Sequence, residues 1–321
     1  MSFVLHKHQM IGAAEEEGTT ILMTQQSNPK VLAICYAQGW CEKSYKMTYA
    51  EAAAVTSIGT VFQNSSINSF NEFQYFTGIT SLAERAFQGS TLTSIRFPNT
   101  ISSLLLRTFY NCKKLSDVLI PSNITNIVNS SYLFSGCTSL LKIKWDSPLV
   151  PLEHIYLQYC REYDSNVYSV IDGILYNGNI LFAIPRAWNK NSYILTVPNN
   201  ITAIGSNAFQ ANSTIKELII NEGCTTIGSN SIYNCSALTT LTLPSTLTTI
   251  NSRSVYTCAK LETIYIYSQQ APTCSATYAM SNIGSSATGT KTIHIVSGAT
   301  GYTTSKWTAL MNAGWNIVED L

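Results

Sequence analysis

The sequence predicts a right-handed β-rich solenoid of short parallel strands, in repeats of about 23 residues, with a small helical N-terminal cap. Two observations predict this fold: leucine and isoleucine recur at fixed phases, and the segment 1–78 lacks that period but carries helix signals. A fixed period in the twenties is typical of solenoids, because one unit cannot bury its own apolar face and must stack on its neighbours.

The repeat is clearest in the second half of the chain. Units begin at Ile79 (a partial copy), Leu92, Leu115, Leu140, Ser192, Ile215, Leu238 and Leu261. The last four starts are equally spaced along the chain. Such regular spacing predicts coils whose equivalent residues lie side by side.

Each unit predicts two short extended segments and a turn. In the unit from Leu92, Ile95 and Phe97 alternate with polar residues, as in a half-buried strand, so Ser94 and Arg96 are expected to face outward. Pro98 ends that strand. A second apolar pair, Ile101 and Leu104 in this unit, forms the corner. One apolar residue then occupies a shared phase before the chain turns back: Phe87, Phe109, Phe134, Phe209, Ile232 and Val255.

Four of the nine cysteines lie three residues after this shared apolar position: Cys112, Cys137, Cys235 and Cys258. A disulfide or metal ladder would need a ligand in every unit, but Ser90 and Asn212 occupy the same phase in sister units. Free cysteine is among the most buried residue types. The pattern therefore predicts a column of small buried thiols, with no metal and no disulfide.

The repeat resembles a known family. The pattern L-T-S-I-x-φ-P-x-x-φ-x-x-I-x-x-x-A-F-x-x-C, seen in residues 92–112, 194–212 and 238–258, is similar to the BspA-type leucine-rich repeat. The resemblance covers two repeat blocks, 79–160 and 192–274. The resemblance implies that the fold is a β-rich leucine-rich-repeat solenoid. It also implies that the protein is one of the surface proteins of host-associated microbes.

Two further segments are similar to parts of the same family. Residues 161–198 resemble its β-hairpin interruption, with turns supplied by Asp172-Gly173 and Asn177-Gly178. Residues 275–321 resemble its closing segment, in which a strand, a short helix carrying tryptophan and a final strand end the chain. Residues 145–160 lack the usual apolar steps, which predicts a deformed coil between the blocks.

Residues 1–78 stand outside the repeat. Pro29 after Asn28 predicts a helix over about 29–38, and Thr48 with Glu51 has the spacing of a capping box. A third short helix or an atypical first coil is expected near Phe73. The region is interpreted as a cap that shields the core from water, or alternatively as a docking module for a larger assembly.

Composition excludes several classes of partner. Lys and Arg number 19 and Asp and Glu 18, so a net charge of +1 gives no electrostatic basis for binding nucleic acid. No apolar run approaches the roughly 20 residues of a membrane span, so no membrane insertion is expected. The start does not read as a signal peptide. Localisation therefore stays open between a cell surface, as the resemblance implies, and a virion or the cytoplasm.

No motif for catalysis is found, and no cofactor is predicted. His6 and His8 make a weak metal signal, and Glu15–Glu17 is better explained as a solvated turn. The remaining catalytic candidates are His154 or His294 in a triad with distant Ser and Asp residues, and Asp146 with Glu153 as paired carboxylates. An enzyme would have its site near the 140–190 interruption. The prediction is that the protein is not an enzyme.

The functional hypothesis is recognition of a protein or glycan surface through outward strand positions, which change from unit to unit. Apolar and aromatic members are favoured, because tyrosine supplies contact area at low entropic cost. The alternatives are a structural part of a phage virion or tail docked through residues 1–78, and an enzyme. The candidate ligand-binding residues are Arg96, Leu119, Lys144, Ile219, Thr242, Tyr265 and Tyr267.

Overall fold

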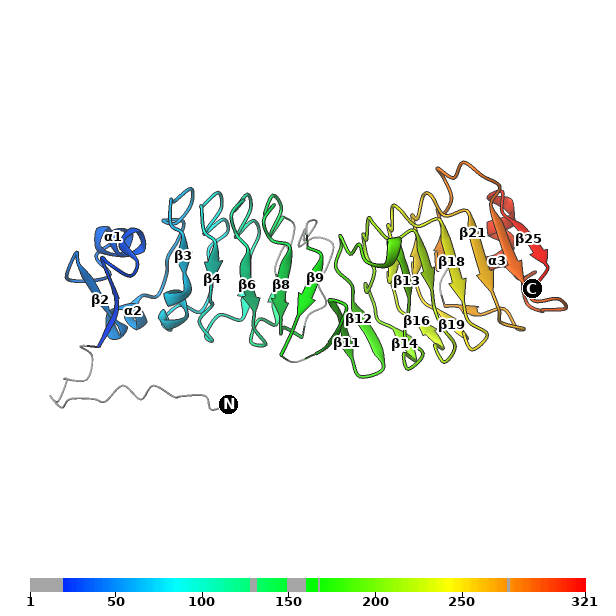
Figure 1. The fold of residues 1–321 in the computed structure, drawn as a ribbon, viewed down its shortest axis with the longest axis horizontal. Coiled ribbons are helices and arrows are strands. Elements are labelled where there is room, and N and C mark those ends of the chain that lie inside the picture. Colours follow the sequence, from blue (N-terminus) through cyan, green and yellow to red (C-terminus); the bar gives the residue numbers. More distant parts are fainter. Residues whose placement is uncertain (1–19, 128–131, 149–159, 167, 276–277) are drawn as a thin grey trace, which may run out of the picture.

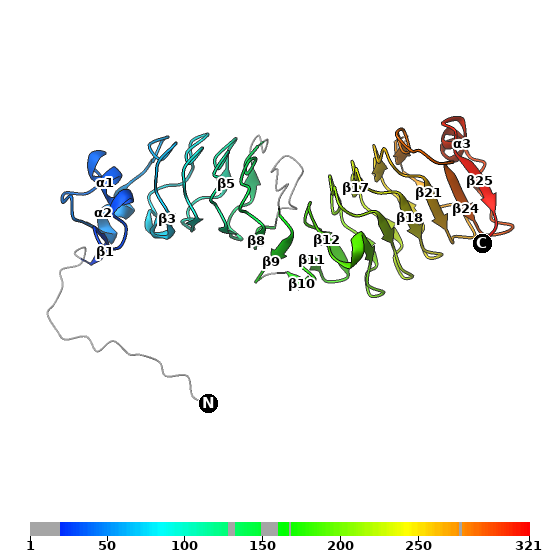
Figure 2. The same cartoon turned by 45° about the horizontal axis from the view of Figure 1, so that its top comes forward.

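The computed structural model describes residues 20–127, 132–148, 160–166, 168–275 and 278–321. They form an elongated stack of coils, with helices at the N-terminal end and a strand and helix at the C-terminal end (Figure 1). Strands of successive coils lie side by side along the stack, as the turned view also shows (Figure 2). The predicted β-rich leucine-rich-repeat solenoid is confirmed.

One strand from each coil builds the strand face of the solenoid. The first sheet has the order β3 (Ser69–Phe70), β4 (Ser94–Ile95), β6 (Asp117–Ile120), β8 (Lys142–Trp145) and β9 (Glu162–Asp164). The second has the order β13 (Ile194–Thr196), β15 (Glu217–Ile219), β18 (Thr240–Leu243), β21 (Thr263–Ile266), β24 (Thr292–Ile295) and β25 (Asn316–Glu319). All pairs are parallel, and Leu195, Leu218, Leu241 and Ile264 face one another because equal spacing keeps them in phase.

The corner segments make further parallel ladders. β5 (Ser103–Leu104) pairs with β7 (Asn126–Ile127) in the N-terminal coils. A seven-stranded sheet has the order β10 (Ser169–Ile171), β11 (Ile174–Asn177), β12 (Ile180–Ala183), β14 (Ala203–Ile204), β16 (Thr226–Ile227), β19 (Thr249–Ile250) and β22 (Thr273–Cys274). A third ladder joins β17 (Ile232–Tyr233), β20 (Val255–Tyr256) and β23 (Met280–Ser281).

The hairpin interruption is part of the solenoid wall. β10, β11 and β12 are antiparallel, and β12 then pairs in parallel with β14 of the next coil. Asp172 and Gly173, with φ of 52° and 77°, turn the chain between β10 and β11, as a two-residue hairpin requires. The last strand of the hairpin is therefore also the first strand of the parallel corner ladder in the second repeat block.

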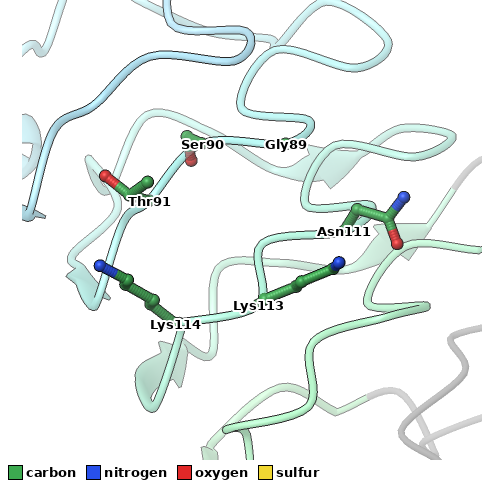
Figure 3. Close-up of a pocket in the computed structure, with 6 residues that line it drawn as sticks. All are labelled: Gly89, Ser90, Thr91, Asn111, Lys113 and Lys114. Atoms are coloured by element: carbon green, nitrogen blue, oxygen red, sulfur yellow. The ribbon is translucent and has the colours of Figure 1, made fainter.

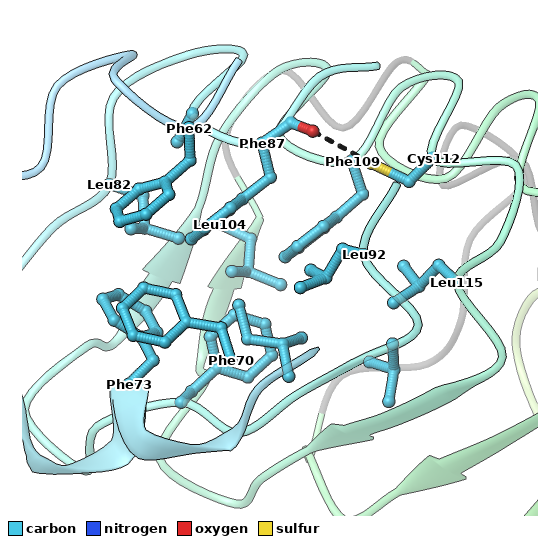
Figure 4. Packing of buried hydrophobic residues seen from close by; sticks show 14 of the residues in the cluster. Phe62, Phe70, Phe73, Leu82, Phe87, Leu92, Leu104, Phe109, Cys112 and Leu115 are labelled. Carbon is cyan, nitrogen blue, oxygen red and sulfur yellow. Dashed lines mark hydrogen bonds between the residues drawn. The ribbon is translucent and has the colours of Figure 1, made fainter. Parts of the chain in front are cut away.

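The shared apolar residues stack along the solenoid axis (Figure 4). The rings of Phe87 and Phe109 have centroids 5.4 Å apart and planes 1° apart, and Phe109 stacks on Phe134 at 5.4 Å and 8°. All three rings are buried. Stacking at the coil spacing buries each ring on both faces, which explains why an aromatic or β-branched residue recurs at this phase.

Glycine permits the closest approach between coils at one corner. A Cβ at Gly228 would lie 2.6 Å from the backbone nitrogen of Ser206 and 2.8 Å from the carbonyl oxygen of Ile204. Gly228 donates a backbone hydrogen bond of 2.9 Å to that same oxygen. The ladder from β14 to β16 therefore continues through this position only without a side chain.

The N-terminal helices close one end of the core. α1 (Pro29–Ala37) begins at Pro29, and α2 (Tyr49–Ala54) has Thr48 and Glu51 in a reciprocal capping box. An antiparallel pair of strands on either side of α1, β1 (Ile21–Thr24) and β2 (Lys46–Thr48), and a 3₁₀ helix, η1 (Asn71–Tyr75), complete this region. Phe62 lies 5.6 Å from Phe87, so one hydrophobic cluster runs from these helices into the first coils.

The C-terminal end closes the second hydrophobic cluster. β24 is followed by α3 (Ser305–Asn312) and then by β25, which pairs with β24 in parallel. Trp307 on α3 and Trp315 before β25 are both buried, and Trp307 contacts Tyr302 with ring centroids 5.0 Å apart. The helix thus covers apolar surface that a further coil would otherwise bury.

Candidate binding surface

The outward side of the second strand sheet presents one residue per strand in a continuous column. We call this the C-terminal column: Thr196, Ile219, Thr242, Tyr265, His294 and Val318. Each member lies directly opposite the next across a parallel strand pair, whereas the residues one position earlier on β15 to β24 are buried. The inward residues are leucine or isoleucine in each of these strands, whereas the outward residues differ from strand to strand. The column therefore determines which chemical groups the strand face exposes.

The first strand sheet presents a second row, the N-terminal column: Arg96, Leu119, Lys144 and Asp164. Leu119 pairs with Lys144, and Lys144 pairs with Asp164. Together the two columns hold six of the seven sequence-predicted candidates. The seventh, Tyr267, follows β21 and is 44% exposed. The structure therefore distributes the predicted residues over two sheets.

Two charged residues of the N-terminal column pair with charged residues of the adjacent strands. The guanidinium of Arg96 donates to both carboxylate oxygens of Asp117, at 3.0 and 2.7 Å. Lys142 lies 3.8 Å from Asp164. Ser94, which the alternation predicted to face outward, is buried instead beside the Arg96–Asp117 pair. Exposed ion pairs contribute little stability, so these residues shape the surface more than they hold the fold.

Tyr265 forms a chain of contacts that sequence spacing did not reveal. Its ring stacks on His294 with centroids 4.8 Å apart, and His294 Nδ1 lies 2.9 Å from both carboxylate oxygens of Asp320. The step along the chain from Tyr265 to His294 is longer than the regular repeat, which hides their pairing. The pairing of Tyr265 with His294 could be found only from the strand register.

The remaining catalytic candidates do not assemble a reactive site within the described part of the chain. Asp146 accepts hydrogen bonds from the hydroxyl of Ser165 and from the backbone and amide nitrogens of Asn166, which fastens the loop after β9. No hydroxyl nucleophile among the described residues hydrogen bonds to His294. The other candidates lie outside the described residues: His6, His8, Glu15–Glu17, Glu153 and His154.

The cysteine column consists of buried thiols, as predicted. The thiol of Cys112 donates to the carbonyl oxygen of Phe87 at 3.0 Å, and no disulfide is present in the ranges that the structure covers. Burial raises the pKa of the Cys112 thiol to about 11. In the same ranges, no group of three or more His, Cys, Asp and Glu residues could hold a metal ion. The Cys112 thiol is therefore neutral and unreactive at neutral pH.

No helix in the described ranges has the length and apolar character needed to cross a membrane.

Solved structures of three bacterial proteins resemble the chain. The pneumococcal vaccine antigen PcpA is 16% identical over 76% of this chain and 78% of that one, with a TM-score of 0.41. A leucine-rich repeat protein from Eubacterium ventriosum is 18% identical over 83% and 71%, with a TM-score of 0.45. A leucine rich cell surface protein from Faecalibacterium prausnitzii is 23% identical over 66% and 58%, with a TM-score of 0.33. No curated protein matches the chain.

The repeat itself identifies the family. A family model described as a BspA type Leucine rich repeat region matches residues 49–169 and 188–299, in six copies. Except for β25, these ranges hold the strands of both columns and most of the stacked core beneath them. By its repeats and by the coils they build, the chain belongs to the BspA-type leucine-rich-repeat family.

Proposed function

We propose that this protein is a non-catalytic recognition module that binds a protein or glycan surface through its outward columns. The observation that carries the proposal is the contrast between neighbouring positions of one strand. Leu218, Leu241 and Ile264 repeat an apolar residue toward the core, whereas Ile219, Thr242 and Tyr265 differ at the outward position. Variation confined to the outward face is expected where a rigid scaffold presents a recognition surface.

The C-terminal column has the chemistry of an adhesive surface. Ile219, Thr242 and Tyr265 combine apolar area with hydroxyl groups and carry no charge, and the exposed Tyr267 lies beyond Tyr265. Tyrosine is enriched in binding sites because its rigid ring offers large contact area and a polar tip. Arg96, Leu119 and Lys144 extend the proposed surface onto the N-terminal column.

Residues 20–78 are proposed to cap the end of the solenoid core rather than to attach the solenoid to a larger assembly. Met23, Val31 and Phe62 belong to the same hydrophobic cluster as Phe87 and Phe109, so the region covers the open end of the coils. A structural role in a larger assembly, docked through residues 1–78, would use the opposite side of this cap. Family membership supports placement at a cell surface.

The proposal is tested by applying the labelled full chain to a printed glycan array and a printed array of extracellular proteins. Tyr265→Ala removes the central ring of the C-terminal column. Tyr233→Ala is the matched control. Like Tyr265, Tyr233 stacks on the ring of a neighbouring strand, here that of Tyr256, but it lies in the β17–β20–β23 ladder.

We expect a bound feature on one array that Tyr233→Ala retains and Tyr265→Ala weakens by about tenfold, as for the loss of a central aromatic anchor. Absence of any bound feature, or equal loss with both variants, would overturn the proposed role of the column.

A further inference from the structure

A pocket of about 370 Å³ opens between two successive coils (Figure 3), and its lining includes no residue of either column. It is lined by Gly89, Ser90, Thr91, Asn111, Lys113 and Lys114. These residues belong to the turns that lead into β4 and β6. Its volume lies at the small end of ligand pockets, which suits one sugar-sized group.

The walls of the pocket are held by hydrogen bonds between coils. Gly89 donates its backbone N–H to the carbonyl oxygen of Tyr110 at 2.8 Å, and the Thr91 hydroxyl donates to the carbonyl oxygen of Ile67 at 2.9 Å. The Ser90 hydroxyl lies 3.4 Å from the Cys112 thiol. The cavity is therefore already formed before any ligand arrives, which lowers the entropic cost of binding.

Two lysines provide the positive charge of the pocket. Lys113 and Lys114 are exposed, and neither ammonium forms an ion pair with any residue that the structure describes. The lining contains no acidic side chain. The two side chains diverge, with Lys113 extending toward the side of Asn111 and Lys114 toward the side of Thr91 (Figure 3). They therefore flank the opening.

The surrounding coils share this excess of positive charge. Residues 79–146 contain seven Lys and Arg but only three Asp and Glu, although the whole chain carries a net charge of only +1. Two of the three acids are engaged, because Asp117 pairs with Arg96 and Asp146 accepts hydrogen bonds from Ser165 and Asn166. A local positive field with few free counter-charges attracts anions.

We propose that this pocket binds a sugar carrying a sulfate or phosphate ester. A lysine ammonium group at the opening would pair with the ester oxygens, and the sugar ring would occupy the pocket between the two turns. The equivalent positions of other coils hold Thr138 and Ser139, or Ser236 and Ala237, so the lysine pair is a property of this coil. The site is separate from the columns and does not depend on their proposed function.

The test is isothermal titration of the full chain with N-acetylglucosamine 6-sulfate, N-acetylglucosamine 6-phosphate, uncharged N-acetylglucosamine and inorganic sulfate. The variant is the double substitution Lys113→Ala and Lys114→Ala. Lys260→Ala is the matched control, because Lys260 is an exposed lysine that follows Cys258 by two residues, as Lys114 follows Cys112. Thermal melting verifies that each variant is folded.

We expect at least one of the two ester sugars to bind. The sugar that binds more tightly shows whether the pocket prefers a sulfate ester or a phosphate ester. The double variant should weaken this binding by about tenfold or more, whereas Lys260→Ala and Tyr265→Ala should not change it. Raising salt from about 50 to about 500 mM should also weaken it, because the lysines are exposed. Equal affinity for the uncharged sugar, equal affinity for inorganic sulfate, or unchanged binding by the double variant would each overturn the proposal.

Discussion

The thiol of Cys112 donates a hydrogen bond of 3.0 Å to the carbonyl oxygen of Phe87, the shared apolar residue one coil earlier. The same contact recurs from Cys137 to Phe109 at 3.1 Å, from Cys235 to Phe209 at 3.2 Å and from Cys258 to Ile232 at 2.9 Å. The thiol is small enough for the core and still satisfies a buried carbonyl, which explains why cysteine recurs at this phase.

Removing one of these thiols should destabilise the solenoid. Cys112→Ala deletes the donor and leaves a small cavity, so we expect the free energy of unfolding to fall by about 1–2 kcal/mol. Cys112→Ser keeps a hydrogen-bond donor, and Ser90 occupies the equivalent position in the preceding coil. The free energy of unfolding should therefore fall less in this variant. Urea unfolding measures both variants; an alanine variant as stable as the wild type would show that the contact contributes nothing.

The buried thiols should make the protein sensitive to alkali. Burial raises the pKa of Cys112 to about 11 and those of Cys35 and Cys160 to about 12, from a reference of 9.0. The folded state favours the neutral thiol, so its stabilisation is complete below pH 9 and is lost as the pH rises from there toward 11 and 12. Each thiol should lower the free energy of unfolding by up to about 1.4 kcal/mol per pH unit in that window.

Urea unfolding at about pH 8.5 and pH 10.5 measures this loss of stability. Cys112→Ser is the control, because it removes one titrating thiol and leaves the tyrosines unchanged. Its stability should fall less steeply with pH than that of the wild type, and equal slopes would contradict the assignment.

The phenylalanine stack should be the most sensitive part of the first block. Phe109 lies between Phe87 and Phe134, with both ring centroids 5.4 Å away. Phe109→Ala should lower the free energy of unfolding by about 3–5 kcal/mol, because it opens a cavity between two rings. Phe109→Ile introduces the residue type that Ile232 provides at the equivalent position of another coil. It should lower the free energy of unfolding by less than half as much as Phe109→Ala. Chemical denaturation compares the two variants, and equal losses of unfolding free energy would argue against the cavity as the cause.

Close coil contact predicts a large effect at Gly228. A Cβ there would lie 2.6 Å from the Ser206 backbone nitrogen, which cannot move without disturbing the ladder. Gly228→Ala should therefore cost about 2 kcal/mol or more. Gly289→Ala is the control, because the exposed Gly289 has only the Glu262 side chain nearby, at 3.2 Å. A melting temperature for Gly228→Ala equal to that of the control would contradict the close approach.

The repeated parts of the fold could be predicted because they depend on local pattern. Leucine and isoleucine at constant phases set the strand register, so Leu218 opposite Leu241 followed from spacing alone. The buried cysteine column followed from its substitution by Ser90 and Asn212. The hydrogen bond from Cys112 to Phe87 did not follow, because it depends on how far one coil is displaced from the next.

The candidate surface was only partly predictable. Thr242 and Tyr265 were placed correctly in one column because their units share the regular repeat length. His294 was missed because a longer connection precedes its strand, and Val318 was missed because the helix α3 replaces the repeat pattern before β25. Ser94 was expected outside and is buried, because alternation identifies the side of a strand but not what covers it. The lysine pocket was missed because it joins two turns that only stacking brings together.

The central claim is that repeated positions set the shape and outward positions set recognition. The most direct measurement is made on a triple variant, Ile219→Thr, Tyr265→Thr and Tyr267→Thr. It gives two positions of the C-terminal column, and the exposed Tyr267 beyond them, the residue already present at Thr242. Its melting temperature and its binding to the glycan and protein arrays are compared with those of the wild type. The account predicts an unchanged melting temperature with loss of array binding. Retained binding by the folded variant would contradict it.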